Sequence, residues 1–217
     1  MIGVIGCAAA FAGLAWLAYR PSVTSVDVRL LNRLMPVGEG GFAARWGERI
    51  VHLGDPASAL AIAAAACAVA LLSGRWSRAI AAAVLVSGAS ATTLILKNQL
   101  AHWRFDPALG YDQIVVTGLP SGHSTALAAE ALALALVAPP RWRPLTIALA
   151  GGIALLGSFA LVILGDHFAS DVVAGWLVAG CWFFAVLTGL RLAEVLRCSL
   201  ANRSPARAPQ ATTEPGG

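Results

Sequence analysis

Residues 165–176 hold a histidine and an aspartate spaced for nucleophilic chemistry. His167 precedes Asp171 by four positions. Residues four apart share one face of a helix, so Asp171 can accept a proton from one ring nitrogen of His167. That bond would fix the tautomer and leave the other nitrogen free to attack an electrophile. The alternatives are a His–Asp pair that closes a helix end and a zinc site, and zinc is the weaker one because no cysteine is near.

A second polar motif, residues 118–124, comes directly before an apolar run. In the order Gly-Leu-Pro-Ser-Gly-His-Ser, Pro120 suits a first helical turn and Ser121 can cap free backbone N–H groups. Gly122 lets the backbone come close to a ligand, and the helix dipole favours an anion there. His123 would stand beside that anion and could donate a proton to a leaving oxygen. An ordinary capped helix with a solvated histidine is the alternative.

Two cations, Lys97 and Arg104, lie seven positions apart at the end of another apolar run. Fixed cations at this spacing can hold an oxyanion, and a guanidinium can do so with two hydrogen bonds. The alternative is anchoring at a membrane interface, where Lys and Arg side chains extend towards water and Trp103 joins an aromatic belt.

The composition indicates what positions these residues. Of 217 residues, 58% are hydrophobic and 12% charged, whereas a soluble domain carries about 25% charged residues. This excludes a soluble enzyme and a disordered chain. The net charge is +4, but no basic stripe suggests nucleic-acid binding. The cysteines have no metal-ligand spacing and are expected to be small buried apolar residues: Cys7, Cys67, Cys181 and Cys198.

The chain is therefore expected to be all-α, a bundle of six transmembrane helices. The predicted spans are Ile2–Ala18, Ala57–Ser73, Ala79–Leu96, Pro120–Ala138, Leu145–Gly165 and Val172–Leu190. The long connection 20–56 mixes apolar residues with arginines, which predicts short amphipathic helices in the interface. Residues 1–200 form one domain, with the motifs within 97–176, and residues 201–217 are expected to be a disordered tail.

The placement of arginines predicts the orientation. With the N-terminus inside, the two short inner loops carry Arg75, Arg78, Arg141 and Arg143, and the short outer loop 166–171 carries no Lys or Arg. Positive short loops favour the cytoplasmic side. We therefore expect an integral membrane protein, in the cell (plasma) membrane, with both termini cytoplasmic. Both histidine motifs would then face outward, in the same water layer.

The three motifs in order, Lys-x6-Arg, Pro-Ser-Gly-His and His-x3-Asp, resemble the type 2 phosphatidic acid phosphatase (PAP2) superfamily. This superfamily also includes acid phosphatases and vanadium haloperoxidases, and the resemblance covers about residues 97–176. It implies that the phosphate is held by Lys97, Arg104, Ser121 and the Gly122 backbone. It also implies that His123 is the general acid, that His167 is the nucleophile which forms a phosphohistidine, and that Asp171 orients His167. No metal and no cofactor are implied, because fixed cations and helix dipoles supply the charge stabilisation.

Two of the three motifs depart from the family pattern. Phe105 follows Arg104 where the family has proline, and Ala160 and Leu161 stand where its third motif has Ser-Arg. Losing one charge-assisted hydrogen bond costs about 1.5–3 kcal/mol. His102 or an arginine of the first connection could substitute.

Glu130, two turns after His123, is expected to make a structural polar contact inside the bundle.

The sequence thus predicts a metal-independent membrane phosphatase that hydrolyses a lipid phosphate or diphosphate monoester. Its partners would be the lipid substrate and the bilayer, and nothing in the sequence specifies an oligomeric state. The alternative is a catalytically weakened relative that binds or moves phospholipids, which the missing arginine motivates. A small transporter is a third and weaker interpretation, because two histidine motifs match the phosphatase pattern.

Overall fold

The computed structural model describes residues 1–18, 20–38, 41–100 and 118–203, and these residues are almost entirely helical. In chain order the elements are α1 (Ile2–Ala18), α2 (Pro21–Gly38), α3 (Gly41–Val51), the 3-10 turn η1 (His52–Gly54), α4 (Pro56–Leu72), α5 (Trp76–Gln99), α6 (Gly122–Val137), α7 (Arg143–Ile163) and α8 (Ala169–Arg203). The six predicted spans correspond to α1, α4, α5, α6, α7 and α8. The predicted all-α fold is therefore confirmed.

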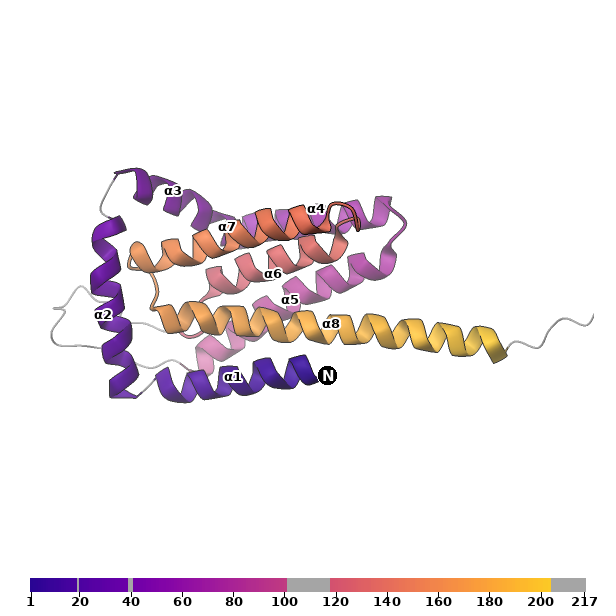
Figure 1. The fold of residues 1–217 in the computed structure, drawn as a ribbon, viewed down its shortest axis with the longest axis horizontal. Coiled ribbons are helices and arrows are strands. Elements are labelled where there is room, and N and C mark those ends of the chain that lie inside the picture. The colour runs from indigo at the N-terminus through magenta and orange to yellow at the C-terminus, as the bar shows by residue number, and fades with distance from the viewer. Residues whose placement is uncertain (19, 39–40, 101–117, 204–217) are drawn as a thin grey trace, which may run out of the picture.

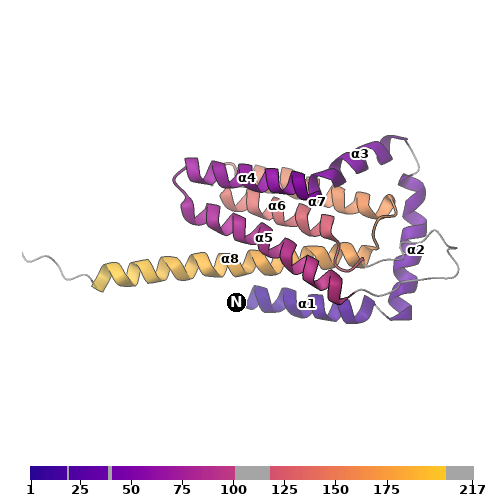
Figure 2. The same cartoon turned by 180° about the vertical axis from the view of Figure 1, so that it is seen from behind.

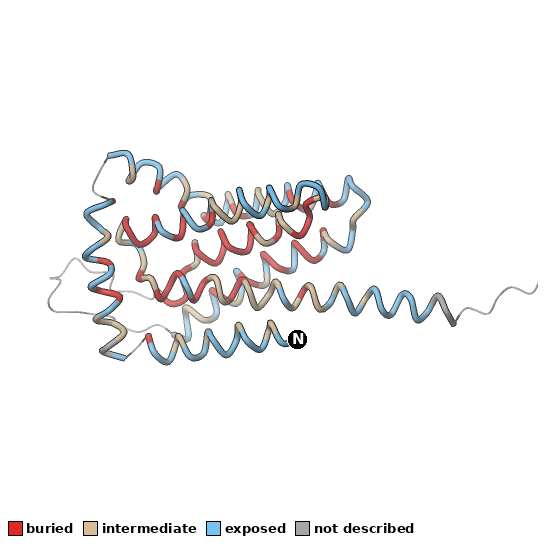
Figure 3. Tube along the Cα trace, in the orientation of Figure 1, coloured by how far each residue is buried: buried red, intermediate tan, exposed pale blue. Residues whose placement is uncertain are grey.

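Helix α6 forms the centre of the bundle and packs against α4, α5, α7 and α8, while α1 packs along α8. These helices run along the long axis of the molecule (Figure 1). Buried residues concentrate in α6 and in the adjoining halves of α7 and α8 (Figure 3). The centre is rich in alanine, with Ala128, Ala129 and Ala179 fully buried. Small side chains let the helix backbones approach closely.

Within the described chain, three helices are long and apolar enough to cross a membrane, namely α5, α7 and α8. The number of candidate spans rises to five if each of two pairs of helices, bent at a short break, forms one span. These pairs are α1 with Val23–Gly38, and Gly41–Gly54 with α4. Large apolar side chains on the outer faces are exposed, including Ile80, Leu94, Leu149 and Leu155. An outer surface of this kind suits lipid, and the chain is an integral membrane protein.

The predicted amphipathic helices of the first long connection are α2 and α3. Helix α2 lies across one end of the bundle, as opposite views agree (Figures 1 and 2). Its Val28 and Leu31 join a buried cluster with Leu161 and Phe168, while Arg29 and Arg33 are exposed. This helix therefore covers the ends of α7 and α8 with its apolar face.

Two expectations need correction. Helix α8 continues past the predicted end at Leu190 to Arg203, so residues 201–203 are helical, and residues 204–217 lie outside the described part. Cys198 is exposed rather than buried, because this part of α8 extends beyond the bundle (Figure 1). Cys7, Cys67 and Cys181 are half-buried and free.

Candidate active site

His167 is positioned by the way α7 ends. The helix closes with a Schellman motif, in which the Gly165 amide donates to the Val162 carbonyl (3.2 Å) and the Asp166 amide to the Leu161 carbonyl (3.0 Å). Gly165 has φ 81°, the left-handed conformation that this motif requires. The His167 amide also donates to the Leu161 carbonyl, at 3.1 Å. The backbone of His167 is thus fixed directly to the end of α7.

The predicted reason for the His167–Asp171 pairing is wrong in one respect. His167 lies before α8, which begins at Ala169, so the two residues do not share a helical face. Asp171 is the third residue of the helix, and its Oδ2 accepts the Phe168 amide at 3.3 Å. This is one half of a capping box, with the acidic residue reaching back to the N-cap amide.

The same Oδ2 of Asp171 lies 3.8 Å from Nδ1 of His167. This distance is longer than a hydrogen bond, and catalytic hydrogen bonds in substrate-free structures are often long. The Asp171 side chain is fully buried, and 12% of the His167 side chain is exposed. With Nδ1 facing the carboxylate, Nε2 is the ring nitrogen that remains for attack.

Asp27, which the sequence analysis did not single out, ties α2 to the start of α8. Its Oδ1 accepts the Ser170 amide at 3.2 Å, and its Oδ2 accepts the Ser170 hydroxyl at 2.5 Å. Both side chains are buried. Because Ser170 lies in the first turn of α8, Asp27 satisfies an N–H group that the helix itself leaves unpaired. The residues are 143 positions apart, so no local pattern could predict this bond.

The start of α6 is bound to the start of α8. Ser121 caps α6 as predicted, with its Oγ accepting the Ser124 amide at 3.3 Å. The Ser121 amide donates to the Asp171 carbonyl at 3.0 Å, and the Ser124 hydroxyl to the Val172 carbonyl at 2.7 Å. Gly175 permits this approach, because a Cβ there would lie 2.9 Å from the Ser121 carbonyl oxygen. The two histidine motifs therefore lie at the same end of the bundle.

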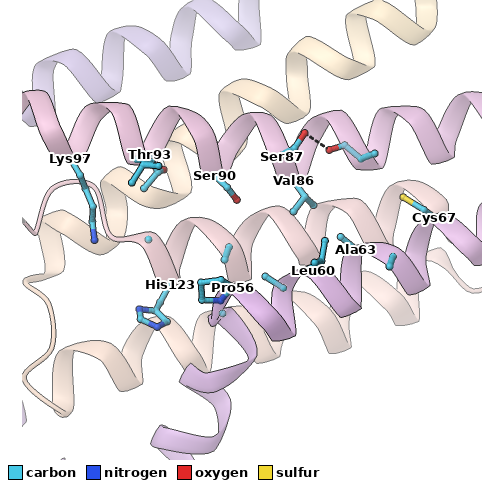
Figure 4. A pocket seen from close by; sticks show the side chains of 17 residues that line it. Pro56, Leu60, Ala63, Cys67, Val86, Ser87, Ser90, Thr93, Lys97 and His123 are labelled. Atoms are coloured by element: carbon cyan, nitrogen blue, oxygen red, sulfur yellow. Dashed lines mark hydrogen bonds between the residues drawn. The ribbon is translucent and has the colours of Figure 1, made fainter.

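Lys97 and His123 lie at one end of an apolar cavity of about 760 Å³ between α4, α5 and α6 (Figure 4). Lys97 approaches the start of α6, since its Nζ is 3.7 Å from where a Cβ on Gly122 would be. The cavity continues to Cys67 and is lined mainly by small and apolar side chains such as Leu60 and Ala63. A cation, a histidine and free N–H groups at a helix start thus adjoin an apolar space.

His123 has a partner that the sequence analysis missed. Its Nε2 lies 2.9 Å from Oδ1 of Asp55, and Nδ1 of His52 lies 2.8 Å from Oδ2 of the same carboxylate. Hydrogen bonds from His123 and then His52 lower the pKa of Asp55. The Asp55-Pro56 pair at the start of an apolar run is a recognisable helix-start signal, but Asp55 makes no side-chain cap to α4. Its carboxylate binds the histidines instead.

Asp166 directly precedes His167 and lies close enough to both histidines to be affected by their charge. Desolvation raises the pKa of this carboxyl, and charge on His167 and His123 acts in the opposite direction. An acidic side chain here opposes the binding of an anion, so we assign it no role in holding phosphate. Among the described residues, no three or more His, Cys, Asp or Glu side chains are grouped to hold a metal ion.

The position of the missing arginine is filled by apolar packing. Leu161 is fully buried, in a cluster with Val28, Leu31 and Val51. Arg104 and His102, predicted for phosphate binding and as a substitute cation, lie outside the described residues. Glu130 is buried, and within the described part of the chain no hydrogen bond reaches its Oε1.

The fold is a helical bundle of an integral membrane protein, with the two histidine motifs at one end. Residues 101–193 match the family model of the PAP2 superfamily, which confirms the resemblance drawn from the three motifs. The chain is also similar to a solved structure, the transmembrane PAP2 type phosphatidylglycerolphosphate phosphatase from Bacillus subtilis. The TM-score is 0.75 at 20% identity, over 88% of this chain and 97% of that one. No curated protein sequence matches the chain. At the level of the family, these findings support a membrane lipid phosphatase.

Proposed function

We propose that this protein removes phosphate from a lipid phosphate or diphosphate through a phosphohistidine intermediate, without a metal. The observation that carries the proposal is the position of Lys97 and His123 at the end of the apolar cavity. A substrate with a phosphate at one end and a hydrocarbon tail suits both parts of this space. The phosphate would contact Lys97, Arg104, Ser121 and the Gly122 backbone, and the tail would occupy the cavity.

In the first step, the lone pair on Nε2 of His167 attacks phosphorus. An N–P bond forms, the P–O bond to the leaving group breaks, and His123 gives its proton to the leaving oxygen. In the second step, the oxygen of a water molecule attacks phosphorus while His123 takes a proton from it. The N–P electron pair returns to His167 and inorganic phosphate is released. Asp171 stabilises the charge that develops on the His167 ring.

We also propose that this site faces the outside of the cell membrane. Both ends of the described chain, at α1 and α8, lie at the end of the bundle away from the site (Figure 1). Arg75, Arg78, Arg141 and Arg143 lie in or next to the two short connections at that end. Such loops favour the cytoplasm, so the termini would be cytoplasmic. Labelling of cysteines introduced near the site, from outside intact cells, tests this orientation.

The direct test is phosphate release by the purified protein from phosphatidic acid, phosphatidylglycerol phosphate and a polyprenyl diphosphate. We expect activity on at least one, and a loss of at least about a hundredfold in His123→Ala and His167→Ala. Labelled phosphate on His167 would support the covalent step. If wild type is indistinguishable from both variants on every substrate, the enzyme proposal fails.

One observation favours a second candidate, a weakened relative that binds or moves phospholipids. Leu161 replaces the family's third-motif cation and is fully buried. This candidate predicts that the protein binds or transports a lipid phosphate without releasing inorganic phosphate. The same assay distinguishes the enzyme from this candidate, because the lipid phosphate would be recovered intact at its end.

A further inference from the structure

Each of the two site histidines faces a carboxylate, but the two pairs are built differently. His167 faces Asp171 at 3.8 Å, four residues along the chain, and that aspartate is fully buried. His123 binds Asp55 at 2.9 Å across 68 residues, and 39% of that aspartate side chain is exposed. The His123 contact is the shorter one, and it joins the start of α6 to the break between α3 and α4.

The hydrogen bonds define which ring nitrogens carry protons. An ionised carboxylate only accepts hydrogen bonds, so Nε2 of His123 must be the donor to Oδ1 of Asp55. Nδ1 of His52 must likewise be the donor to Oδ2. The proton that His123 exchanges with substrate or water is then the one on Nδ1. A carboxylate on the opposite nitrogen stabilises the ring when both nitrogens carry protons.

The backbone around Asp55 holds the carboxylate in place. Gly54 packs so close to His123 that an added Cβ would lie 3.0 Å from the His123 carbonyl oxygen. Pro56 begins α4 directly after Asp55, and its ring restricts the backbone at both positions. The second hydrogen bond, from His52, fixes the rotation of the carboxylate group.

We propose that Asp55, held by His52, is a positioning residue that orients His123 and stabilises its protonated form as the proton donor. This inference rests on the proposed function, because it assigns His123 the general-acid role. It extends the active site to the α3–α4 break, outside the three sequence motifs. Asp55 acts through His123 and does not itself contact the substrate.

Other charged groups also influence His123. They include His52 on η1, which shares Asp55 with His123, and Lys97 at the same end of the cavity. Asp166, whose carboxyl is affected by both His123 and His167, is another. Glu48 on α3 acts on Asp166. The tests must therefore distinguish the loss of the Asp55–His123 contact from the effect of a change in charge near His123.

The first test compares two leaving groups in the full-length purified protein. The substrates are a long-chain alkyl phosphate and a nitrophenyl phosphate carrying the same alkyl chain. An alkoxide needs a proton in order to leave, whereas nitrophenolate does not. We expect Asp55→Asn and His123→Ala to lose at least roughly tenfold in first-turnover rate on the alkyl ester, and less than about threefold on the nitrophenyl ester. Equal losses on both esters, or no loss in Asp55→Asn, would overturn the proposal.

The second test is the pH profile of kcat/KM. In general, a carboxylate that accepts a hydrogen bond from an imidazole favours the doubly protonated ring. The alkaline limb of Asp55→Asn should therefore move to lower pH, while the acid limb stays in place. His52→Gln should move the same limb in the same direction by less, and Asp55→Glu should restore part of the wild-type profile. Glu48→Gln is the matched control, because it removes a nearby carboxylate that does not contact His123, and its profile should equal that of wild type.

A third measurement does not depend on activity. Diethylpyrocarbonate modifies neutral imidazole, so the pH at which His123 becomes reactive, read by mass spectrometry, reports loss of its proton. We expect that pH to be lower in Asp55→Asn than in wild type and Glu48→Gln. An unchanged value overturns this inference even if the protein is an active phosphatase. If the pH of reactivity is lower in Asp55→Asn but the protein releases no phosphate, the contact between Asp55 and His123 is supported and the proposed function is rejected.

Discussion

The carbonyl oxygen of Leu161 accepts the amide of His167 at 3.1 Å, while the side chain of Leu161 is fully buried in an apolar cluster. One residue thus fixes the backbone of the proposed nucleophile and fills an apolar cluster beneath α2. This explains how the chain retains an ordered His167 without the third-motif arginine. It also determines what happens when that arginine is restored.

Leu161→Arg is expected to destabilise the protein rather than increase its activity. The substitution would place a guanidinium among Val28, Leu31 and Val51, at a cost of roughly 2–4 kcal/mol for an unpaired buried charge. Thermal unfolding in detergent and phosphate release measure the two effects. Leu161→Met, of similar volume, should retain both stability and activity. A gain in activity at unchanged stability would show that the arginine reaches the phosphate and that no other group fills its role.

Gly165→Ala is expected to disturb His167 through the backbone. An alanine at φ 81° costs about 1–2 kcal/mol. The new Cβ would cause no steric clash, because its nearest neighbouring atom is Cε of Met35 at 3.4 Å. Phosphate release should fall by roughly tenfold or more if His167 moves from its position. Gly152→Ala on α7, where a Cβ meets nothing within 4 Å, is the control and should leave both stability and activity unchanged.

Gly175→Ala is expected to separate the two histidine motifs. The new Cβ would lie 2.9 Å from the Ser121 carbonyl oxygen and from the Thr125 amide nitrogen, so α6 and α8 must move apart. Overpacking of this kind costs about 1–3 kcal/mol, and phosphate release should fall together with the melting temperature. The control is Gly189→Ala, on the same helix with no atom within 4 Å. Equal melting temperatures and equal phosphate release in Gly175→Ala and Gly189→Ala would contradict the role assigned to the contact between α6 and α8.

Ser90→Phe is expected to fill part of the cavity and so discriminate between substrates by tail length. Ser90 lines the cavity on α5 (Figure 4). kcat/KM for a long-chain phosphatidic acid should fall by roughly tenfold, whereas that for a short-chain phosphatidic acid should change by less than about twofold. Ile95→Phe places the same ring on an exposed position of the same helix outside the cavity lining and should affect neither. Equal loss on both tail lengths would argue against a tail in this cavity.

The pH dependence of kcat/KM should be bell-shaped. His167 must be neutral to attack and His123 protonated to donate, so activity falls on both sides. The pKa of Asp55 is lowered by its hydrogen bonds from His123 and then His52. Its contribution to stability is therefore present above its ordinary pKa and is lost only as the pH falls through the lowered value. Below about pH 4, melting temperatures of wild type and Glu48→Gln should therefore fall more steeply than that of Asp55→Asn, which lacks this carboxylate.

The sequence by itself determined the helices and the motifs at their ends. Apolar runs too long for a soluble core specify membrane-spanning helices, because a helix satisfies its own backbone hydrogen bonds in lipid. Ser121 at a helix start specifies a cap, and the order of the two histidine motifs is a local property of the chain. These features depend on residues close together in sequence, so spacing alone could predict them.

The tertiary structure decided which residues complete the site. Asp55 binds His123 across 68 residues and Asp27 binds Ser170 across 143, and no periodicity encodes which helix ends meet. The geometry of His167 likewise depends on the end of α7 rather than on the helical face that its spacing to Asp171 suggested. Packing of small residues such as Gly54 and Gly175 brings these ends together, because only the close approach of helices places a distant carboxylate within hydrogen-bond distance of a histidine.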